Sequence, residues 1–371
     1  KDWERWVADN IIRSQTIHYL EKPGLHTLRI RAIDPFLVLQ RFEIDAGGLL
    51  PSYLGPPESY HNVHHTKGED GYKLWLRYRP LNARMQDACA PFLKGLYIGE
   101  QSSVMNAAAE ELKHAVTLMT GLSLRSLAAD EVLKNGGILA GTWKDRVIRN
   151  LFTQRERDSV GPEGYAIKST GNRLFIAGST DKGTLYGVFH VLRLMQTGKS
   201  LENLCITENP AFDLRILNHW DNPDRSVERG YAGLSLWEWD ALPENVSSRY
   251  RDYARANASV GINAAVLNNV NADVCFLTPG YLEKIAVLAG IFRDYGIRVF
   301  LSVNFSSPEI LGGLPTSDPM DPHVNKWWQD KVQEIYRYIP DFGGFLVKAN
   351  SEGRSGPLDY GRTHADGANM L

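Results

Sequence analysis

The sequence predicts an α/β protein in which a small α/β sandwich domain precedes the first half of a (β/α)8 TIM barrel, with an N-terminal β-sandwich remnant in front of both. Three observations support this fold class. Apolar and polar residues alternate over residues 1–60, strand and helix patterns are mixed over residues 61–207, and apolar runs alternate with helix patterns over residues 208–371. These three segments are the predicted domains.

The first segment has the alternation typical of half-buried antiparallel strands, in three runs at residues 6–12, 26–34 and 37–45. The prolines between residues 51 and 57 exclude helix from the stretch that follows, which we interpret as a linker. His61, His64 and His65 come directly after it. A loop cluster of histidines is more often solvent-exposed than metal-bound, so we expect no metal site there.

Strand and helix signals are mixed in the second segment, as in a compact α/β sandwich. The expected order is strand, amphipathic helix, strand, hairpin and helix, at residues 93–98, 102–120, 137–140, 165–168 with 173–177, and 183–196. The glycine-rich residues 178–183 could cradle a phosphate at the start of the last helix. Their spacing matches neither the Walker nor the dinucleotide-binding pattern, so we interpret them as a capped helix start.

Four apolar runs in the third segment have the length and composition of buried parallel strands. They cover residues 214–218, 262–267, 297–303 and 344–347, with helices expected at residues 244–259, 278–296 and 323–339. The clearest helix start is Thr278-Pro279, a cap residue followed by proline at the first helical position. Alternating strands and helices predict right-handed crossover units, so four strands would form half of an eight-stranded barrel.

Charged residues follow the fourth apolar run, which leads into Lys348 and then into Glu352. Residues just past the carboxyl ends of barrel strands line the active-site face, so both side chains are expected in one pocket. The ammonium can hold a substrate carboxylate, and the carboxyl can protonate a leaving oxygen if burial raises its pKa. The alternative is a surface loop in which both charges are simply solvated.

Composition excludes some partners. The 371 residues have 43% hydrophobic side chains, which allows sizeable cores, and a net charge of −2, which gives no reason to expect nucleic acid or an anionic membrane as partner. No apolar run approaches the roughly 18 to 20 residues that span a bilayer. Cys89, Cys205 and Cys275 are widely spaced and odd in number, which predicts free thiols and no disulfide framework.

The chain opens at Lys1 without an initiator methionine and stops at Leu371 inside a predicted active-site loop. We therefore expect a piece of a longer protein. Its localisation is left open, as cytoplasmic or as periplasmic or extracellular in a bacterium.

Several motifs resemble those of the family 67 glycoside hydrolases, the α-glucuronidases that remove (4-O-methyl)glucuronic acid from xylan fragments. The motifs are EDGYKLWLRY at 69–78, STDKGTLYGVF at 179–189, NHWDN at 218–222, LNNVN at 267–271, KANSEG at 348–353 and YGRTHADGANM at 360–370. They occur in the family's order from about residue 61 onward. The resemblance implies a small α/β domain, an eight-stranded barrel and a helical C-terminal domain, the last of which is absent here. We expect no cofactor and no metal.

The resemblance also implies roles at matching positions. Glu352 falls on the family's general acid, which protonates the glycosidic oxygen, and Lys348 falls on a residue that binds the glucuronate carboxylate. Trp220 falls on an aromatic residue near the 4-position of the sugar, and Val270 on a small apolar residue that makes room for the 4-O-methyl group. Further pocket neighbours are expected, without assigned roles, at Asn269, Asn304, Arg362 and His364.

The family inverts configuration, so a second carboxylate must activate water across the sugar ring. In the family this base comes from later strands. We expect it past Leu371, so that this chain alone is inactive. The implied reaction is hydrolysis of the α-1,2 bond between (4-O-methyl)glucuronic acid and xylose, with glucuronoxylan-derived oligosaccharides as partners. Whether the full-length protein is a homodimer is left open.

The first segment resembles a different family. Residues 26–35 and the motif SYLGPPES at 52–59 are similar to the extreme C-terminal β-domain of family 115 glycoside hydrolases, α-glucuronidases that act on longer xylan. If so, the gene would encode two α-glucuronidases in tandem and this chain would span their junction. The alternative is an appended β-sandwich that binds sugar or only packs.

Two other functions are compatible with parts of the sequence. Hexosaminidases combine a related small domain with a barrel, but their acid follows an Asp, whereas Ser351 precedes Glu352 here. A non-catalytic carbohydrate-binding protein would keep pocket aromatics such as Trp220 and lose the acid. The presence of Glu352 argues against it, although the base of the full-length protein is not visible in this sequence.

Overall fold

The computed structural model describes residues 14–22, 24, 26–30, 42–45, 47 and 70–371. The chain divides into two compact units, Lys1–Glu69 and Asp70–Leu371. In the first unit the described residues form neither helix nor strand, and residues 26–30 and 42–45, which we expected in strands, are exposed. The third expected strand, at residues 6–12, and the histidines at 61–65 lie outside the described residues. The β-sandwich therefore stays a prediction.

The second unit begins with a five-stranded mixed sheet in the order β1-β2-β4-β3-β5. Its strands are β1 (Leu96–Ile98), β2 (Gly137–Thr142), β3 (Tyr165–Thr170), β4 (Arg173–Gly178) and β5 (Cys205–Glu208). β1, β2 and β4 are parallel, whereas β3 is antiparallel to both of its neighbours. Gly171 turns the predicted β3–β4 hairpin with a φ of 58°, a value that glycine adopts without strain.

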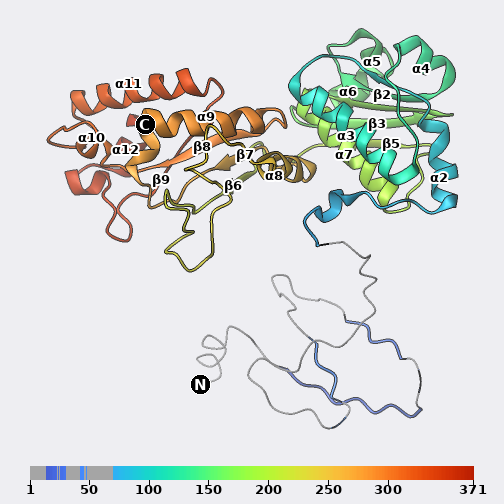
Figure 1. Cartoon of the computed structure of the whole chain (residues 1–371), viewed down its shortest axis with the longest axis horizontal. Coiled ribbons are helices and arrows are strands. Elements are labelled where there is room, and N and C mark those ends of the chain that lie inside the picture. Colours follow the sequence, from blue (N-terminus) through green and yellow to red (C-terminus); the bar gives the residue numbers. More distant parts are fainter. Residues whose placement is uncertain (1–13, 23, 25, 31–41, 46, 48–69) are drawn as a thin grey trace. The chain divides into compact units, whose positions relative to one another are not determined.

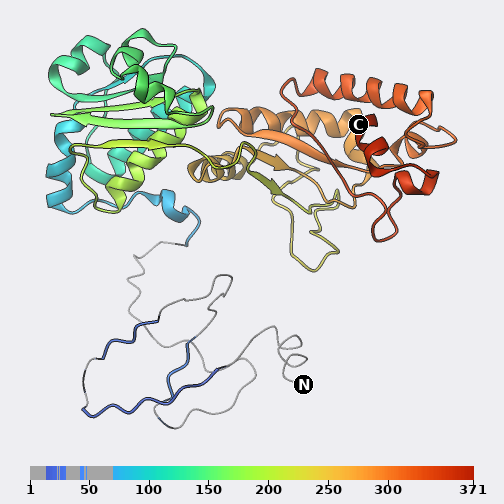
Figure 2. The same cartoon turned by 180° about the vertical axis from the view of Figure 1, so that it is seen from behind.

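Helices cover both faces of this sheet (Figures 1 and 2), which makes a three-layer sandwich. α3 (Ser103–Thr120) and α7 (Asp181–Gln196) lie on one face, and α4 (Ala129–Asn135) and α5 (Arg146–Asn150) on the other. The alternation along β2 explains the two layers: Ile138 and Ala140 join the core of α3 and α7, while Leu139 joins that of α4 and α5. The shorter elements are η1 (Leu74–Arg77), α2 (Ala83–Cys89), η2 (Ala90–Phe92) and α6 (Gln154–Asp158).

The glycine-rich stretch before α7 caps that helix, as expected. The Thr180 hydroxyl accepts a hydrogen bond from the Gly183 amide at 3.4 Å. A Cβ on Gly183 would lie 2.2 Å from the Gly164 carbonyl oxygen, so this glycine is required for close backbone packing.

The rest of the second unit contains a four-stranded sheet in the order β6-β7-β8-β9, parallel throughout. The strands are β6 (Ile216–Asn218), β7 (Ala264–Val266), β8 (Arg298–Val303) and β9 (Gly344–Val347). α8 (Ser248–Ser259), α9 (Pro279–Arg293) and α11 (Pro322–Tyr338) connect successive strands, and α9 and α11 lie on the same side of the sheet in both views (Figures 1 and 2). The remaining elements are η3 (Val274–Leu277), α10 (Ser307–Ile310), η4 (Pro357–Tyr360) and α12 (His364–Met370). The four predicted strands and three predicted helices are confirmed.

The prediction that all four strands are buried is wrong at the edges of the sheet. β7 is buried throughout, but all of β6 is exposed and β9 is only half-buried. β6 and β9 each pair on one side only, so fewer neighbours cover their side chains.

Two helix starts show how local chemistry sets the boundaries. α8 begins at Ser248, four residues later than expected, because the Ser247 hydroxyl caps it by accepting from the Arg249 amide at 3.3 Å. α9 begins at Pro279 with Thr278 at the N-cap, as predicted. The Thr278 hydroxyl donates to the Cys275 carbonyl at 2.6 Å instead of capping the helix.

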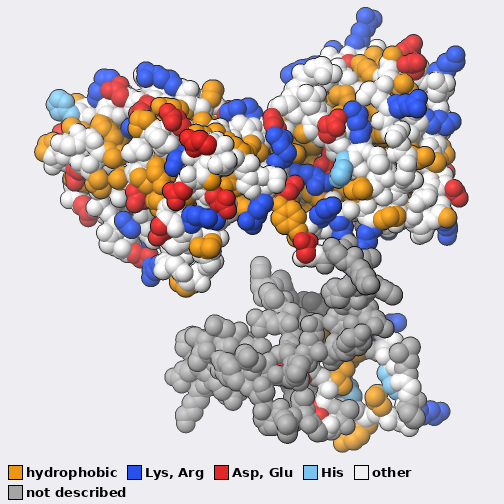
Figure 3. Space-filling model, in the orientation of Figure 1, with side chains coloured by type: hydrophobic (Ala, Val, Ile, Leu, Met, Phe, Trp, Pro, Cys, Tyr) orange, Lys and Arg blue, Asp and Glu red, His pale blue; other side chains and the backbone are white. Residues whose placement is uncertain are grey.

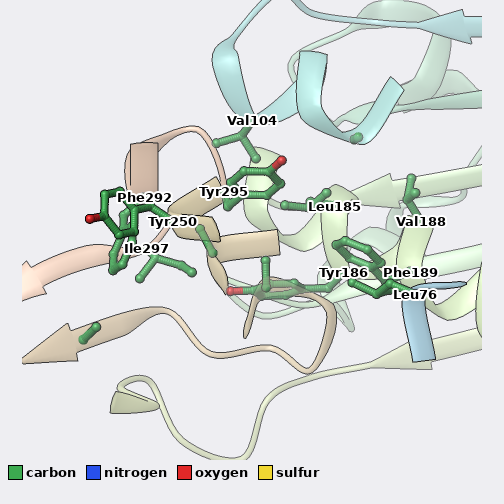
Figure 4. Packing of buried hydrophobic residues seen from close by; sticks show 14 of the residues in the cluster. Leu76, Val104, Leu185, Tyr186, Val188, Phe189, Tyr250, Phe292, Tyr295 and Ile297 are labelled. Carbon is green, nitrogen blue, oxygen red and sulfur yellow. The ribbon is translucent and has the colours of Figure 1, made fainter. Parts of the chain in front are cut away.

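One apolar core runs through the second unit and contains residues from η1, α3, α7, α8 and α9 (Figure 4). Two carboxylates, one buried and one half-buried, add polar links. Glu111 of α3 accepts from Arg255 of α8, with Nε 2.6 Å from Oε2, and Glu163 accepts from Arg215 at 2.5 Å and from Asn263 at 3.0 Å. These links join the α/β sandwich to the parallel sheet.

The distribution of surface charges and the state of the cysteines are as the composition predicts. Acidic and basic side chains are interspersed on the visible face of residues 70–371 (Figure 3). Cys89, Cys205 and Cys275 are free thiols, buried, exposed and half-buried respectively. Among the described residues, no helix has both the length and the apolar character to cross a bilayer.

Candidate active site

The carboxyl ends of β6, β7, β8 and β9 lie along one edge of the parallel sheet, and polar residues follow each strand. Asn268 ties two of these ends together. Its buried side chain donates to the Ser302 carbonyl at 2.9 Å and accepts from the Ser302 amide at 2.8 Å, which continues the β7–β8 pairing. The loop after β7 therefore starts from a fixed position.

That loop links the loops after β6 and β9. The Asn269 amide donates to the Glu228 carbonyl at 3.1 Å, in the loop after β6, and its Oδ1 accepts from the Asn271 amide at 2.9 Å. Asn271 Oδ1 in turn accepts from the Lys348 ammonium at 3.0 Å, in the loop after β9. Val270 lies within this chain of contacts and is half-buried. Two predicted site residues, Asn269 and Lys348, are thus connected through Asn271.

Lys348 and Glu352 are in direct contact. Lys348 Nζ lies 2.5 Å from Glu352 Oε2, and the Lys348 side chain is only 16% exposed. The contact depends on a turn in which Asn350 and Glu352 have φ values of 51° and 48°, in the left-handed region that non-glycine residues rarely adopt. Asn350 fixes the turn by donating to Asp359 Oδ1 at 3.1 Å. The two side chains that we expected in one pocket are therefore in contact, and their roles toward a substrate stay predictions.

A second cation binds the same carboxylate. Arg229, in the loop after β6, places Nη2 3.0 Å from Glu352 Oε2, and its Nε lies 3.5 Å from Glu228 Oε1. Glu228 has a φ of 56°, and its side chain is 11% exposed. The Glu352 carboxylate is therefore held between Lys348 and Arg229, from loops on opposite edges of the sheet.

Burial would have to raise the pKa of Glu352 for it to hold a proton as an acid, and this environment does not supply that burial. Its side chain is 58% exposed. The hydrogen bond from Lys348, the Lys348 charge and the Arg229 charge hold the pKa of Glu352 below its ordinary value, because each favours the ionised carboxylate. Beside these two cations, Glu352 is therefore an anion at neutral pH.

Trp220 stands at the end of β6 and is 39% exposed. Its carbonyl accepts from the Glu228 amide at 2.7 Å, so Trp220 and Asn269 hold the same residue of the β6 loop. The preceding residue, His219, packs on the fully buried Trp237, with ring centroids 5.1 Å apart. Trp237 Nε1 donates to the Leu267 carbonyl at 3.1 Å, which fixes the end of β7.

The structure does not bring the other three predicted neighbours to Glu352. Asn304 Oδ1 accepts from the Ser306 amide at 2.9 Å and stabilises its own turn. Arg362 binds Asp318 through two hydrogen bonds of 2.9 Å each, and this contact lowers the pKa of the Asp318 carboxyl. His364 is exposed at the start of α12. Their substrate contacts stay predictions.

Sequence reasoning missed Arg229, Glu228 and Asn271. A signal for the first two was present, since Glu228-Arg229-Gly230 is a charged pair before a glycine and follows the polar end of a predicted strand. Asn271 belongs to the quoted motif LNNVN but was given no role. The backbone geometry that directs Arg229 toward Glu352 has no such signal.

Two further features do not belong to this site. A surface hollow of about 680 Å³ lies along α11 and contains none of the predicted site residues; it is lined by Trp327, Asp330, Lys331, Gln333, Glu334, Arg337 and Tyr338. Across the described ranges, no group of three or more His, Cys, Asp or Glu residues could hold a metal ion.

Comparison with known families decides the assignment. Residues 74–191 match the N-terminus of glycosyl hydrolase family 67, and residues 194–371 match the middle domain of the same family. Residues 74–371 of the chain belong to glycoside hydrolase family 67. Residues 1–58 match the C-terminal domain of glycosyl hydrolase family 115. Both resemblances seen in the sequence are thereby confirmed.

Curated relatives carry the same assignment. A probable α-glucuronidase A of Aspergillus terreus is 38% identical over 312 residues, and the α-glucuronidase A of Aspergillus tubingensis is 37% identical over 312 residues. Each alignment covers 82% of this chain and 36% of the relative, so the chain spans about a third of the relatives' length.

A solved family 115 structure shows the same kind of fold. It is described as a 4-O-methyl-α-glucuronidase with specificity for decorated arabinogalactans, and it is similar at a TM-score of 0.50 and 15% identity, covering 75% of this chain and 39% of that one. This similarity supports a mixed α/β fold for the chain.

Proposed function

We propose that the full-length protein is an inverting α-glucuronidase. It would hydrolyse the α-1,2 bond between (4-O-methyl)glucuronic acid and xylose in glucuronoxylan-derived oligosaccharides. The observation that carries this proposal is the contact between Lys348 and Glu352, at 2.5 Å, in the loop after β9. It places a cation suited to the glucuronate carboxylate beside a carboxyl group suited to the glycosidic oxygen.

In this proposal Glu352 is the general acid and gives a proton to the glycosidic oxygen as the bond to xylose breaks. A base in the part of the full-length protein that follows Leu371 removes a proton from the attacking water on the opposite face of the sugar. The sheet β6-β7-β8-β9 would be the first half of a (β/α)8 barrel, which accounts for polar residues at each strand's carboxyl end.

Trp220 and Val270 support the methylated form of the substrate. Trp220 is 39% exposed, which leaves an aromatic face available to a sugar, and Val270 lies in the loop next to Asn269 and Asn271. An apolar pair of this kind favours a methyl ether over a bare hydroxyl. Asn269, Asn304, Arg362 and His364 are proposed as further neighbours of the substrate in the full-length protein.

One observation favours a second candidate, a non-catalytic carbohydrate-binding protein. The cations around Glu352 lower its pKa, whereas a general acid must hold a proton at working pH. Such a protein would bind glucuronoxylan oligosaccharides without hydrolysing them.

Proton NMR of an aldotetraouronic acid incubated with the full-length gene product separates the two. Release of 4-O-methylglucuronic acid as the β-anomer supports the inverting hydrolase. Release of the α-anomer first would contradict inversion. A folded protein that binds the sugar and releases nothing would favour the non-catalytic function.

A further inference from the structure

We infer that Arg229 is a second residue that binds the substrate carboxylate. Lys348 and Arg229, the cation pair, exchange their hydrogen bonds to Glu352 for hydrogen bonds to the glucuronate when substrate binds. The inference rests on the proposed function and deepens it, because it names a specificity-determining residue and a way for substrate binding to place a proton on Glu352.

The cation pair already forms an anion site. Both cations lie on one oxygen, Glu352 Oε2, with Lys348 Nζ at 2.5 Å and Arg229 Nη2 at 3.0 Å. The anion that the two cations bind in this structure is the protein's own carboxylate. A glucuronate carries the same chemical group and can accept the same two charge-assisted hydrogen bonds.

Arg229 is held in place by the residue before it. Glu228 Oε1 lies 3.5 Å from Arg229 Nε, and Glu228 Oε2 is buried without a hydrogen-bond partner in the described part of the chain. Two hydrogen bonds fix the Glu228 backbone. Its amide donates to the Trp220 carbonyl at 2.7 Å, and its carbonyl accepts from the Asn269 side-chain amide at 3.1 Å. Arg229 therefore projects from a rigid turn although its own side chain is 62% exposed.

Backbone strain gathers in the two loops that form this site. The described residues include seven non-glycine positions with positive φ, and four of these are Arg225, Glu228, Asn350 and Glu352. Such conformations persist only where the surroundings fix them, and they are concentrated at ligand sites. Both sides of the contact between Arg229 and Glu352 are thus held in an unfavourable backbone geometry.

Exchange of the anion changes the protonation of Glu352. The charged groups that face it are Lys348 and Arg229, with Glu228 behind Arg229. When glucuronate takes the cation pair, Glu352 loses two favourable charges, gains an anion nearby and loses water to the bound sugar, and each change disfavours its ionised form. Its carboxylate then takes one proton from solvent and becomes a carboxylic acid that can donate to the glycosidic oxygen. A neutral glucoside leaves the cation pair on Glu352, which stays ionised.

Calorimetric titration of the full-length gene product with methyl α-D-glucuronide, in buffers of different ionisation heat, measures the proton directly. We expect binding to take up close to one proton at a pH between the pKa values of Glu352 in the free and bound protein, and methyl α-D-glucoside to take up none. Glu352→Gln should bind the glucuronide with no proton uptake.

Arg229→Gln should bind the glucuronide about tenfold more weakly, the loss expected for one charge-assisted hydrogen bond, and bind the glucoside unchanged. Arg229→Lys should restore part of the affinity. Arg251→Gln is the matched control, because Arg251 is also an exposed arginine (55%) paired with a carboxylate, Asp294, at 3.3 Å. It should leave affinity and proton uptake unchanged, and thermal unfolding of each variant verifies its fold.

Two results would overturn the inference: glucuronide binding without proton uptake, or an Arg229→Gln variant with wild-type affinity. Hydrolysis of an aldouronic acid in the same preparation tests the proposed function separately. Hydrolysis without proton uptake would remove only the inference. Proton-linked binding without hydrolysis would remove only the proposed activity. Absence of glucuronide binding would remove both.

Discussion

Glu352 accepts a hydrogen bond from Lys348, the residue four positions before it, with Oε2 2.5 Å from Nζ. This spacing usually brings side chains together on a helix, but here a left-handed turn at Asn350 and Glu352 does so in a loop. The proposed acid and the proposed carboxylate-binding residue are thus one electrostatic unit. Lys348 lowers the pKa of Glu352, so a change at Lys348 also alters the proposed acid, which shapes the predictions below.

Glu352→Gln removes the proposed acid and keeps its shape. In the full-length protein we expect turnover of natural aldouronic acids to fall by about 10²- to 10⁴-fold, since a general acid contributes about that much. Binding should be largely retained. Steady-state rates on the natural substrate and on an aryl glucuronide with a good leaving group check this, because only the first needs the acid. Near-normal rates on the natural substrate would exclude Glu352 as the acid.

Lys348→Ala removes a charge that is 16% exposed and contacts both Asn271 and Glu352. Discrimination between glucuronate and neutral glucose at the same linkage should fall by about 10- to 100-fold, the value of one hydrogen bond between charged groups. Lys326→Ala is the control, since Lys326 is 67% exposed and paired with Asp330 on α11. Selectivity is measured as the ratio of kcat/KM values. An unchanged ratio would assign carboxylate binding to another residue.

Val270→Leu should fill the space proposed for the 4-O-methyl group. The preference for 4-O-methylglucuronic acid over glucuronic acid should fall by about tenfold, because one methylene in an apolar pocket is worth about 1 to 3 kcal/mol. Competition between the two sugars for the binding site measures the preference. Val246→Leu, at a valine that is 48% exposed, serves as control. A preserved preference would place the methyl group elsewhere.

Glu163→Gln should lower the free energy of unfolding by about 2 kcal/mol at neutral pH, because Glu163 accepts charge-assisted hydrogen bonds from Lys182 and Arg215. Burial alone would raise the pKa of Glu163, but these hydrogen bonds outweigh it and lower the pKa. The pKa of Glu163 is lower in the folded state than in the unfolded state, where it is about 4.3. The resulting stabilisation is complete at pH values above the unfolded-state pKa and is lost as the pH falls through the folded-state pKa.

Urea unfolding of wild type and Glu163→Gln between about pH 3 and 7 measures that difference. The gap in unfolding free energy should be constant near neutrality and shrink below about pH 4.3. Glu110→Gln is the matched control, since Glu110 is 72% exposed and paired with Lys113 at 3.0 Å, and should change stability by less than about 1 kcal/mol. A gap that grows on acidification would contradict the lowered pKa.

Trp237→Ala should destabilise the protein by about 3 to 5 kcal/mol, as expected for truncation of a fully buried aromatic residue. The change also removes the Nε1 donor to the Leu267 carbonyl and the ring that supports His219. Trp237→Phe keeps most of the apolar volume and should cost less. Denaturant unfolding measures both variants. A loss below about 1 kcal/mol for Trp237→Ala would show that the site does not depend on this support.

The sequence was sufficient wherever neighbouring residues set the structure. The four apolar runs became β6 to β9, Thr278-Pro279 opened α9, and Gly171 turned the β3–β4 hairpin. Each of these depends on local backbone preferences or on side-chain alternation, which a linear pattern records. The nearness of Lys348 and Glu352 also has a local origin, because both follow the same strand.

Tertiary structure alone decided the electrostatics of the site. A role as acid required a raised pKa for Glu352, but the pKa is lowered, with Arg229 contributing from 123 residues away in the chain. Arg362, expected near the substrate, is bound by Asp318. A pKa depends on every charge within a few ångströms, whichever segment supplies it, and on how much water surrounds the group. The sequence names the groups that can react, and the fold determines which charges surround them.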